Sequence, residues 1–436
     1  PQVWGGLADL HDGGADEWTR LINLVLAAQR GPATREDQVA LRDHAVYVPR
    51  LTRRVGQPLA TPLELRNDAT YLVTGGLGSV GLEIAGYLAG HGAGNLVLTS
   101  RRPPSDAARR RLDALSAQYG SQFRVVASDV ADPHDVARLL ATVQDELPPL
   151  AGIVHAAGEI GTTPLSALDD AEIDRVFAGK VWGAWNLSEA TADLRLDFFL
   201  STSSIAAVWG SFGQAAYSAA NAFLDGLSDR LRERRYISVN FGPWSAGMAD
   251  EDARARLDQR GVRTLPPADA LAGMADLLVA ATSSGAQRPT QGVVARIDWS
   301  RFLPLYQLSG KRSFLAELEA EVPTTMPAAA PSSTTRLVER LTVAPVQQRK
   351  RLVLEHLRDI VAEVTRIEVT EIREDTGFFD LGMDSLMAVE MRRRVEHAVG
   401  SELPATLAMD YPRLVDVADY LLDGVLRSEE HTSELQ

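Results

Sequence analysis

A glycine-rich turn between a predicted strand and a predicted helix constrains the fold of this chain more than any other feature. Residues 71–74 form a short apolar run, and residues 82–88 show the spacing of apolar side chains that is typical of a helix. Glycines between two such elements let the backbone turn sharply and let a pyrophosphate approach the helix N-terminus, where free N–H groups favour anions. We therefore predict a dinucleotide site here, with a plain strand–helix turn as the alternative. Its residues are Thr74, Gly75, Gly76, Leu77, Gly78, Val80 and Gly81.

Strand and helix signals alternate along the chain after residue 69. Strands separated by helical stretches favour parallel βαβ crossovers. We therefore predict an α/β fold with a doubly wound, parallel Rossmann-type sheet. Its six predicted strands cover residues 71–74, 96–98, 123–126, 151–154, 198–200 and 237–239.

A proline-rich segment divides the chain into a larger and a smaller part. Residues 322–335 contain three prolines and no charged side chain, which is typical of an extended spacer. Before the predicted sheet, the apolar runs at 39–41 and 45–48 are predicted to be strands, and no ligand-binding glycine turn accompanies them, so we expect a truncated structural subdomain there. The expected boundaries are 1–66 for that subdomain, 67–307 for the sheet domain, 308–345 for the linker, 346–426 for a helical domain and 427–436 for a tail.

The part after the linker is predicted to be a small α-helical bundle. Residues 352–364, 385–399 and 414–422 have helical spacing of apolar side chains. Its charge is −8, from 16 acidic and 8 basic side chains in residues 351–423. Either this is a solvated helical surface, or the bundle docks onto basic patches of partners. The second predicted helix shows one apolar face at successive i, i+4 positions, formed by Met387, Met391, Val395 and Val399.

Composition excludes several classes of protein. The 436 residues carry 58 acidic and 44 basic side chains, a formal net charge of −14, whereas nucleic-acid binders usually need the opposite sign to neutralise phosphate. There are no cysteines, which excludes disulfides and thiolate metal sites and favours a reducing compartment. No apolar stretch approaches the roughly 18 residues of a membrane span. We predict a cytoplasmic protein that binds no nucleic acid, no membrane and no metal.

The end of the second predicted strand indicates which dinucleotide is bound. Ser100, Arg101 and Arg102 stand where NAD-binding proteins have an acidic residue for the ribose 2′-OH. An arginine there accommodates a 2′-phosphate, so we predict NADPH, with two solvated surface arginines as the alternative. Asp129 and Val130 follow the third strand and are predicted to flank the adenine.

Residues 203–224, read with the glycine turn and a second motif, resemble the ketoreductase domain of modular (type I) polyketide synthases, within the short-chain dehydrogenase/reductase superfamily. Residues 4–7, 36–38 and 48–51 extend the resemblance, which covers residues 1–305. It implies reduction of a β-ketoacyl thioester by NADPH. The second motif, which the resemblance adds to the cofactor site, consists of His155, Ala156, Ala157 and Gly158.

The same resemblance implies the catalytic residues. Tyr217 would be the acid, with Ser204 thirteen residues before it, Asn221 four after it and Lys180 further upstream. Many relatives place the lysine four residues after the tyrosine, and polyketide ketoreductases show the exchange found here. A free tyrosine has a pKa near 10, and we expect Lys180 and the cationic nicotinamide to lower the pKa of Tyr217. Ser204 would orient the ketone oxygen, and Asn221 would hold a water of a proton relay.

Stereochemistry is also predicted from the resemblance. Reductases of the D-hydroxyl type carry Leu-Asp-Asp where this chain has residues 160–162, and we expect the later Leu-Asp-Asp at 168–170 to cap the next helix. Trp209 marks the L-hydroxyl type, and Gln214 suggests that an unepimerised α-substituent is accepted. With Met248, these residues are assigned to stereocontrol, and we predict an L-3-hydroxyacyl product. Residues 245–261 suit a mobile lid or an ordinary surface helix.

Residues 378–386 resemble the attachment motif of acyl carrier protein domains, and this resemblance covers residues 349–426. It implies that Ser385 receives a 4′-phosphopantetheine arm, because a hydroxyl at a helix N-terminus places the phosphodiester in a favourable dipole. A plain N-cap serine is the alternative. The implied partners are a phosphopantetheinyl transferase, ketosynthase and acyltransferase domains upstream of Pro1, and a next module or thioesterase downstream. A fatty-acid-synthase-type fragment and a reductively inactive scaffold with a carrier role remain as alternatives.

Overall fold

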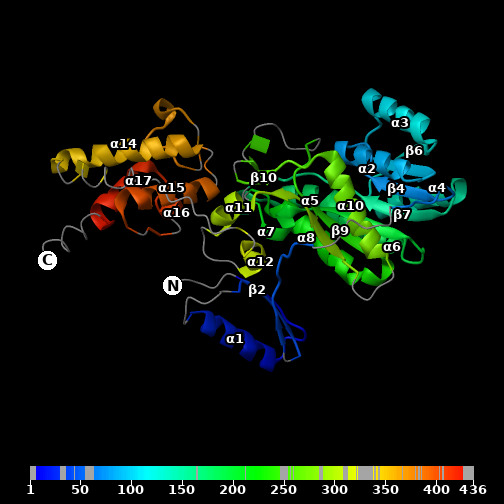
Figure 1. Cartoon of the computed structure of the whole chain (residues 1–436), viewed down its shortest axis with the longest axis horizontal. Helices are drawn as coiled ribbons and strands as arrows, with labels where there is room; N and C mark the ends of the chain where they lie inside the picture. The colour runs from blue at the N-terminus through cyan, green and yellow to red at the C-terminus, as the bar shows by residue number, and fades with distance from the viewer. Residues whose placement is uncertain are drawn as a thin grey trace. The chain divides into compact units, whose positions relative to one another are not determined.

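A computed structural model describes most of the chain. The described residues are 6–29, 36–43, 45–54, 63–163, 165–211, 213–245, 254–255, 257–258, 260–283, 288–307, 313–320, 322, 337, 340–341, 344–365, 367–378, 380–381, 383, 385–401, 403–404 and 407–425. Contacts divide the chain into two compact units, one running from Arg54 to Asp298 and the other comprising Pro1–Arg53 with Trp299–Gln436. Figure 1 traces the helices and strands along the chain.

The first unit contains a sheet of seven parallel strands in the order β11-β9-β8-β7-β4-β5-β6. All six predicted strands are confirmed. The seventh, β11, is a short edge strand that contains a glycine and was not predicted. The strands are β4 (Thr70–Thr74), β5 (Asn95–Ser100), β6 (Gln122–Ala127), β7 (Leu150–His155), β8 (Phe198–Ser204), β9 (Tyr236–Phe241) and β11 (Gln291–Val294).

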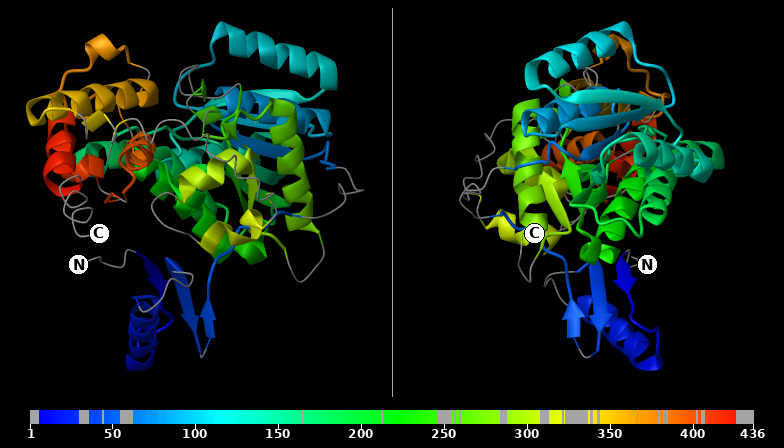
Figure 2. Two further views of the ribbon diagram at one scale, coloured as in Figure 1. Left: turned by 60° about the vertical axis from the view of Figure 1, so that its left-hand side comes forward. Right: turned by 90° about the vertical axis from the view of Figure 1, so that its right-hand side faces the viewer.

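Helices cover both faces of this sheet, as the two views of Figure 2 show. Side chains alternate along a strand, so Leu72 points to one face while Tyr71 and Val73 point to the other. The predicted doubly wound architecture is thereby confirmed. The helices in chain order are α2 (Ser79–Gly90), α3 (Asp106–Tyr119), α4 (Pro133–Glu146), α5 (Asp170–Phe177), α6 (Gly183–Ala190), α7 (Ile205–Trp209), α8 (Ala215–Arg230) and α10 (Pro267–Thr282).

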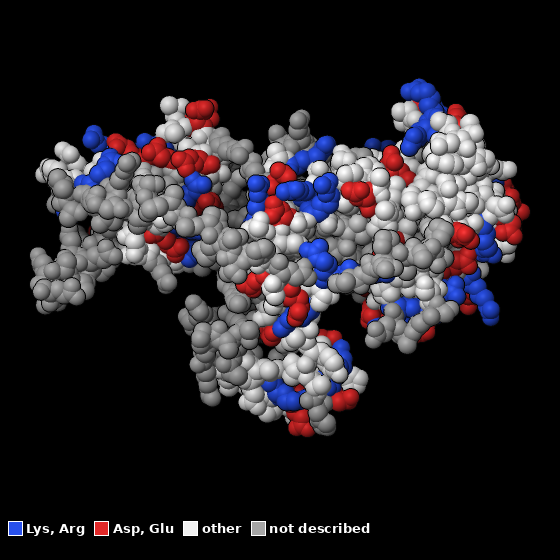
Figure 3. Space-filling view, in the orientation of Figure 1, with Lys and Arg blue, Asp and Glu red and all other residues white. Residues whose placement is uncertain are grey.

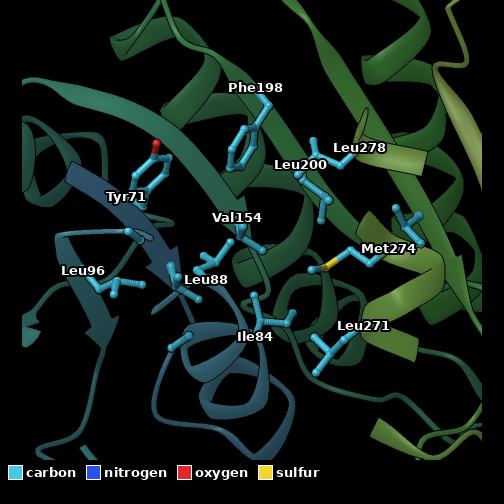
Figure 4. Packing of buried hydrophobic residues seen from close by; sticks show 14 of the residues in the cluster. Tyr71, Ile84, Leu88, Leu96, Val154, Phe198, Leu200, Leu271, Met274 and Leu278 are labelled. Carbon is cyan, nitrogen blue, oxygen red and sulfur yellow. The ribbon is translucent and has the colours of Figure 1, made fainter. Parts of the chain in front are cut away.

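The larger apolar core lies between the sheet and helices α2 and α10. In Figure 4, Ile84 of α2 and Met274 of α10 point toward the strand residues Val154 and Leu200. All four side chains are at most 1% exposed. Burying one such side chain stabilises the fold by about 1.5–3 kcal/mol. This packing holds α2, the helix that follows the glycine turn, against the sheet.

The structural subdomain at the start of the chain is a three-stranded sheet with one helix. Strands β1 (Leu7–Asp9) and β2 (Gln38–Arg42) pair in parallel, and β3 (Ala45–Tyr47) pairs antiparallel with β2. Helix α1 (Ala15–Gln29) packs Leu21 against this sheet. The runs predicted at 39–41 and 45–48 are confirmed as strands, whereas β1 and α1 were not predicted, since much of their apolar surface is exposed.

The helical bundle after the linker has its own core. Its helices are α14 (Val346–Thr365), α15 (Ser385–Val399), α16 (Leu407–Asp410) and α17 (Leu414–Tyr420). The three predicted helices are confirmed, and the single-turn α16 is additional. Phe378, Met391 and Val395 are at most 1% exposed in this core. Acidic side chains form a row over α14 on the face shown in Figure 3.

Among the described residues, no helix has the length and apolar character that crossing a bilayer requires.

Candidate active site

The order of the parallel strands reverses at β4, which lies between β5 and β7. In open α/β sheets, ligands bind at such a switch point, outside the carboxyl ends of the strands. The glycine turn follows β4, Arg101 and Arg102 follow β5, and the motif beginning at His155 follows β7. The structure therefore brings the three predicted parts of the dinucleotide site to one edge of the sheet.

The glycine turn leaves no room for larger residues. Gly75 has φ +63°, and a Cβ there would lie 2.7 Å from the Ala156 carbonyl oxygen. A Cβ on Gly81 would lie 2.4 Å from the Gly75 carbonyl oxygen. The N-cap residue of α2 is Gly78, so no side chain caps the first turn of this helix. An uncapped N-terminus behind a glycine turn fits a pyrophosphate.

The side chains predicted to read the rest of the cofactor lie at the next two strand ends. The Arg101 guanidinium forms an ion pair with Glu159, and the Arg102 N–H donates to Ser100 Oγ at 3.2 Å. The Asp129 carboxylate accepts from the Ala131 N–H at 3.1 Å, which closes the turn after β6. Roles for Arg101, Arg102, Asp129 and Val130 toward a ligand stay predictions.

His155 ties the first strand of the site to the lysine segment. Its fully buried ring pairs with Thr74 Oγ1 at 2.8 Å through Nδ1 and with the Lys180 carbonyl oxygen at 3.3 Å through Nε2. Burial lowers the pKa of His155 to about 3, so the ring is neutral at physiological pH. The ring is thus enclosed by protein and links Thr74 to the Lys180 backbone, and the role of His155 toward a cofactor stays a prediction.

Lys180 lies on a π-helical turn, η2 (Ala178–Trp182), directly after α5. Its ammonium donates to the Thr202 carbonyl oxygen at 2.8 Å and lies 5.6 Å from the centroid of the Tyr217 ring. Burial lowers the pKa of Lys180 to about 8, and the negative charge of Asp225 opposes that shift. A Cβ on Gly158 would lie 2.6 Å from Lys180 Cγ, so this glycine gives the lysine its path to the tyrosine.

The other predicted catalytic residues gather around Tyr217 of α8. Ser204, the last residue of β8, accepts from the Ala206 N–H at 3.1 Å as N-cap of α7, and its side chain acts to lower the pKa of Tyr217. Asn221, one turn further along α8, donates to the Tyr217 carbonyl oxygen at 2.7 Å. Its buried Oδ1 has no hydrogen-bond partner among the described residues, which fits an acceptor for a water.

The pKa of Tyr217 differs from our expectation. Burial raises it above its usual value, while hydrogen bonding by Ser204 and Asn221 acts in the opposite direction. Lys180, which we expect to lower this pKa together with a bound cationic nicotinamide, is not among the causes of the shift. Desolvation of the phenolate is the larger effect, because Tyr217 packs in an apolar cluster with Val176 and Ala220.

Two of the three residues assigned to stereocontrol lie at helix ends near Tyr217 in the sequence. Trp209 ends α7, and Gln214 is the N-cap of α8. Met248 and most of the predicted lid lie outside the described residues. The Leu-Asp-Asp at 168–170 caps a helix as predicted, since the Asp169 carboxylate accepts from the Glu172 N–H at 2.9 Å.

A partly buried polar network around Asp225 was missed from the sequence. The Asp225 carboxylate accepts from Ser238 Oγ at 2.5 Å, from Asn240 Nδ2 at 2.9 Å and from Gln291 Nε2 at 3.0 Å. Asn240 also donates to Ser203 Oγ at 2.9 Å, which links the network to the catalytic strand. The available signal was spacing, because Asp225 lies two helical turns after Tyr217 on the same face of α8.

In the helical bundle, Ser385 is the first residue of α15. The preceding motif is anchored by Phe378, which is fully buried and whose N–H donates to the Pro412 carbonyl oxygen at 2.9 Å. Gly382 and Asp384 of the predicted motif lie outside the described residues. A serine at the start of a 15-residue helix fits attachment of an anionic group.

Two protein-family models match the chain. One, the KR domain, matches residues 69–246, and the other, the phosphopantetheine attachment site, matches residues 355–421. Polyketide synthase GfsA of Streptomyces halstedii is 35% identical over 433 residues, covering 97% of this chain and 6% of that protein. Pikromycin polyketide synthase component PikAIII of Streptomyces venezuelae is 32% identical, covering 99% of this chain and 28% of its own length. The chain thus spans less than a third of either curated relative.

A solved structure shares the fold of the larger part. The ketoreductase from the first module of phoslactomycin biosynthesis in Streptomyces sp. HK803 aligns with a TM-score of 0.62 and 33% identity, covering 72% of this chain and 70% of that one.

Proposed function

The chain belongs to the modular polyketide synthases, as a ketoreductase domain followed by a phosphopantetheine-carrying domain, and from this we propose a specific reaction. The ketoreductase domain reduces a β-ketoacyl thioester, carried on a phosphopantetheine arm, to an L-3-hydroxyacyl thioester, and NADPH is the reductant. One observation supports this most directly: Lys180 and Ser204 converge on Tyr217 at the edge of the sheet that carries the glycine turn.

The residues at the switch point fit a nicotinamide dinucleotide. No side chain caps the N-terminus of α2, so the N–H groups of its first turn can bind a pyrophosphate. Gly75 and Gly81, where a Cβ would meet backbone atoms, keep the turn tight enough for this. Arg101 and Arg102 would hold the 2′-phosphate. When bound, NADPH supplies the hydride for the ketone carbon.

The side chains of the chain itself would supply orientation and the proton. Ser204 would donate to the ketone oxygen, and the Tyr217 hydroxyl would protonate the alkoxide as it develops. The buried ammonium of Lys180, which lies 5.6 Å from the centroid of the Tyr217 ring, would stabilise negative charge on the phenol and thereby favour this proton transfer. Asn221 Oδ1, buried and without a partner among the described residues, would accept from a water that replaces the proton.

Removing the arginines should change the choice of cofactor. Arg101→Ala and Arg102→Ala are each expected to raise KM for NADPH by about tenfold and to leave KM for NADH nearly unchanged, because a hydrogen-bonded charge contributes about 1.5–3 kcal/mol. Steady-state kinetics with both cofactors measures this. Arg110→Ala on α3 is the matched control and should leave both values unchanged. Equal losses with NADPH and NADH would contradict a 2′-phosphate site.

Product chirality tests the stereochemical part of the proposal. The full chain, supplied with NADPH and a 3-ketoacyl pantetheine thioester, should give mainly the L-3-hydroxyacyl product, as Trp209 indicates. Chiral chromatography of the released acid measures the ratio. With a 2-methyl-3-ketoacyl thioester, the methyl centre should keep its configuration, as Gln214 indicates. A mainly D product would overturn the assignment.

The carrier domain completes the proposed cycle. Ser385 would take its 4′-phosphopantetheine arm from a phosphopantetheinyl transferase, and the arm would deliver the thioester to the reductase at high effective concentration. The proposed neighbours are ketosynthase and acyltransferase domains upstream, with a further module or a thioesterase downstream.

A further inference from the structure

The loop between β7 and the next helix is attached to α5 by an array of side-chain hydrogen bonds. This loop, residues 159–163, follows Gly158 and precedes η1 (Leu165–Ala167). It occupies the place where the stereochemical motif of related reductases is expected. None of the catalytic or cofactor roles proposed above uses the side chains of α5.

Glu172 of α5 binds the end of the loop. Its Oε1 accepts from the Thr162 N–H at 3.1 Å and from the Thr163 N–H at 3.3 Å, and its Oε2 accepts from Thr163 Oγ1 at 2.5 Å. Asp169 is the N-cap residue of α5, so Glu172 is the third residue of the helix. In a capping box, a glutamate at this position hydrogen-bonds back to the N–H of the N-cap residue. Here the carboxylate reaches the loop instead. Hydrogen bonding by Thr163 lowers the pKa of Glu172 below its usual value, so the carboxylate is charged at neutral pH.

Arg175, one turn along the same helix, binds the start of the loop. Its guanidinium pairs with Glu159 at 2.8 Å and donates to the Ile160 carbonyl oxygen at 3.4 Å. A second guanidinium nitrogen lies 3.9 Å from the Glu172 carboxylate. Both ends of the loop are therefore held by two neighbouring side chains of α5.

The loop so held is continuous with the catalytic cluster. At its start, Gly158 lies against the stem of Lys180. Near its end, a Cβ on Gly213 would lie 3.2 Å from the Thr162 carbonyl oxygen, and Gly213 directly precedes Gln214 at the start of the tyrosine helix. Between them, a Cβ on Gly161 would lie 3.0 Å from Val176 Cγ2, and Val176 packs in the same cluster as Tyr217. A displacement of the loop would thus change the wall beside the tyrosine.

We propose that Glu172 is a positioning residue that fixes loop 159–163 against the start of α8 and thereby determines which face of the ketone receives hydride. The inference rests on the proposed reduction. The ratio of the two stereoisomers depends exponentially on the difference between two transition-state energies, with tenfold for about 1.4 kcal/mol. A small movement of the wall that lowers only the barrier to the disfavoured face changes this ratio while the rate, which the barrier to the favoured face sets, stays nearly the same.

Glu172→Ala in the full chain tests the proposal. We expect the ratio of the two 3-hydroxy stereoisomers to fall by about tenfold, since charge-assisted hydrogen bonds to the loop are lost. The kcat of Glu172→Ala should fall by less than about threefold relative to the wild-type protein. Glu172→Gln keeps one acceptor oxygen and should retain part of the ratio, and Thr163→Val should lower it without altering α5. Asp174→Ala, an exposed acidic residue of the same helix, is the matched control.

Amide hydrogen exchange of the peptide covering residues 158–168 gives a readout that does not depend on activity. Exchange should rise in Glu172→Ala and stay unchanged in Asp174→Ala. Unchanged exchange would overturn the bracing role. Faster exchange with an unchanged stereoisomer ratio would overturn the link to stereocontrol. If the wild-type protein reduces no thioester, the proposed function and this link fail together, and the exchange result still decides whether Glu172 holds the loop.

Discussion

Tyr217→Phe is expected to lower kcat for reduction of a 3-ketoacyl thioester by roughly a thousandfold, since general acid catalysis contributes about 10²–10⁴. The substitution keeps the ring in the apolar cluster with Val176 and Ala220 and removes only the hydroxyl. The proton donor for the alkoxide is then gone, while the packing is retained. NADPH consumption at saturating thioester measures kcat.

Two controls separate a chemical defect from a folding defect. Tyr119→Phe removes a hydroxyl from an exposed tyrosine at the end of α3 and should leave kcat unchanged. NADPH binding by Tyr217→Phe, followed by cofactor fluorescence, should match the wild-type protein, because the glycine turn is untouched. A variant that keeps more than about a tenth of the wild-type kcat would contradict the role of Tyr217. A wild-type protein that consumes no NADPH would instead favour a carrier role without reduction.

Ser385→Ala is expected to abolish loading of the carrier completely. The phosphopantetheine arm forms a phosphodiester with a hydroxyl, and alanine offers none. After incubation with a phosphopantetheinyl transferase and coenzyme A, intact mass should show one added arm on the wild-type chain and none on the variant. Because α15 begins at this residue and its core contacts come from residues such as Met391 and Val395, the bundle should keep its fold.

The same variant separates the two domains functionally. Ser385→Ala should still reduce a free 3-ketoacyl pantetheine thioester at the wild-type rate, since the reductase residues are unchanged. Ser401→Ala, two residues beyond the end of the same helix, should load normally. An arm that still attaches to Ser385→Ala would show that another residue is the attachment site.

Patterns local in the chain could be predicted from the sequence because they depend on neighbouring residues. Strands such as 151–154 are short apolar runs, and their alternation with helical spacing requires parallel crossovers. The glycine turn needs no distant partner to be recognised, and Tyr217 and Asn221 share a face of α8 by their spacing alone. By contrast, much of the surface of α1 and β11 is exposed, so the hydrophobic pattern of their sequences is too weak to predict them.

The relation between distant residues was decided only by the tertiary structure. Nothing in the spacing of Lys180 and Tyr217 requires contact, and the 5.6 Å between the lysine ammonium and the tyrosine ring results from a π-helical turn packed at the end of β8. The pKa of Tyr217 is likewise raised by the burial that packing imposes, against our expectation. The attachment of loop 159–163 to Glu172 joins segments whose sequences show no sign of pairing. Periodicity and turn chemistry are local properties of a chain, whereas desolvation and charge pairing arise only when remote segments exclude water together.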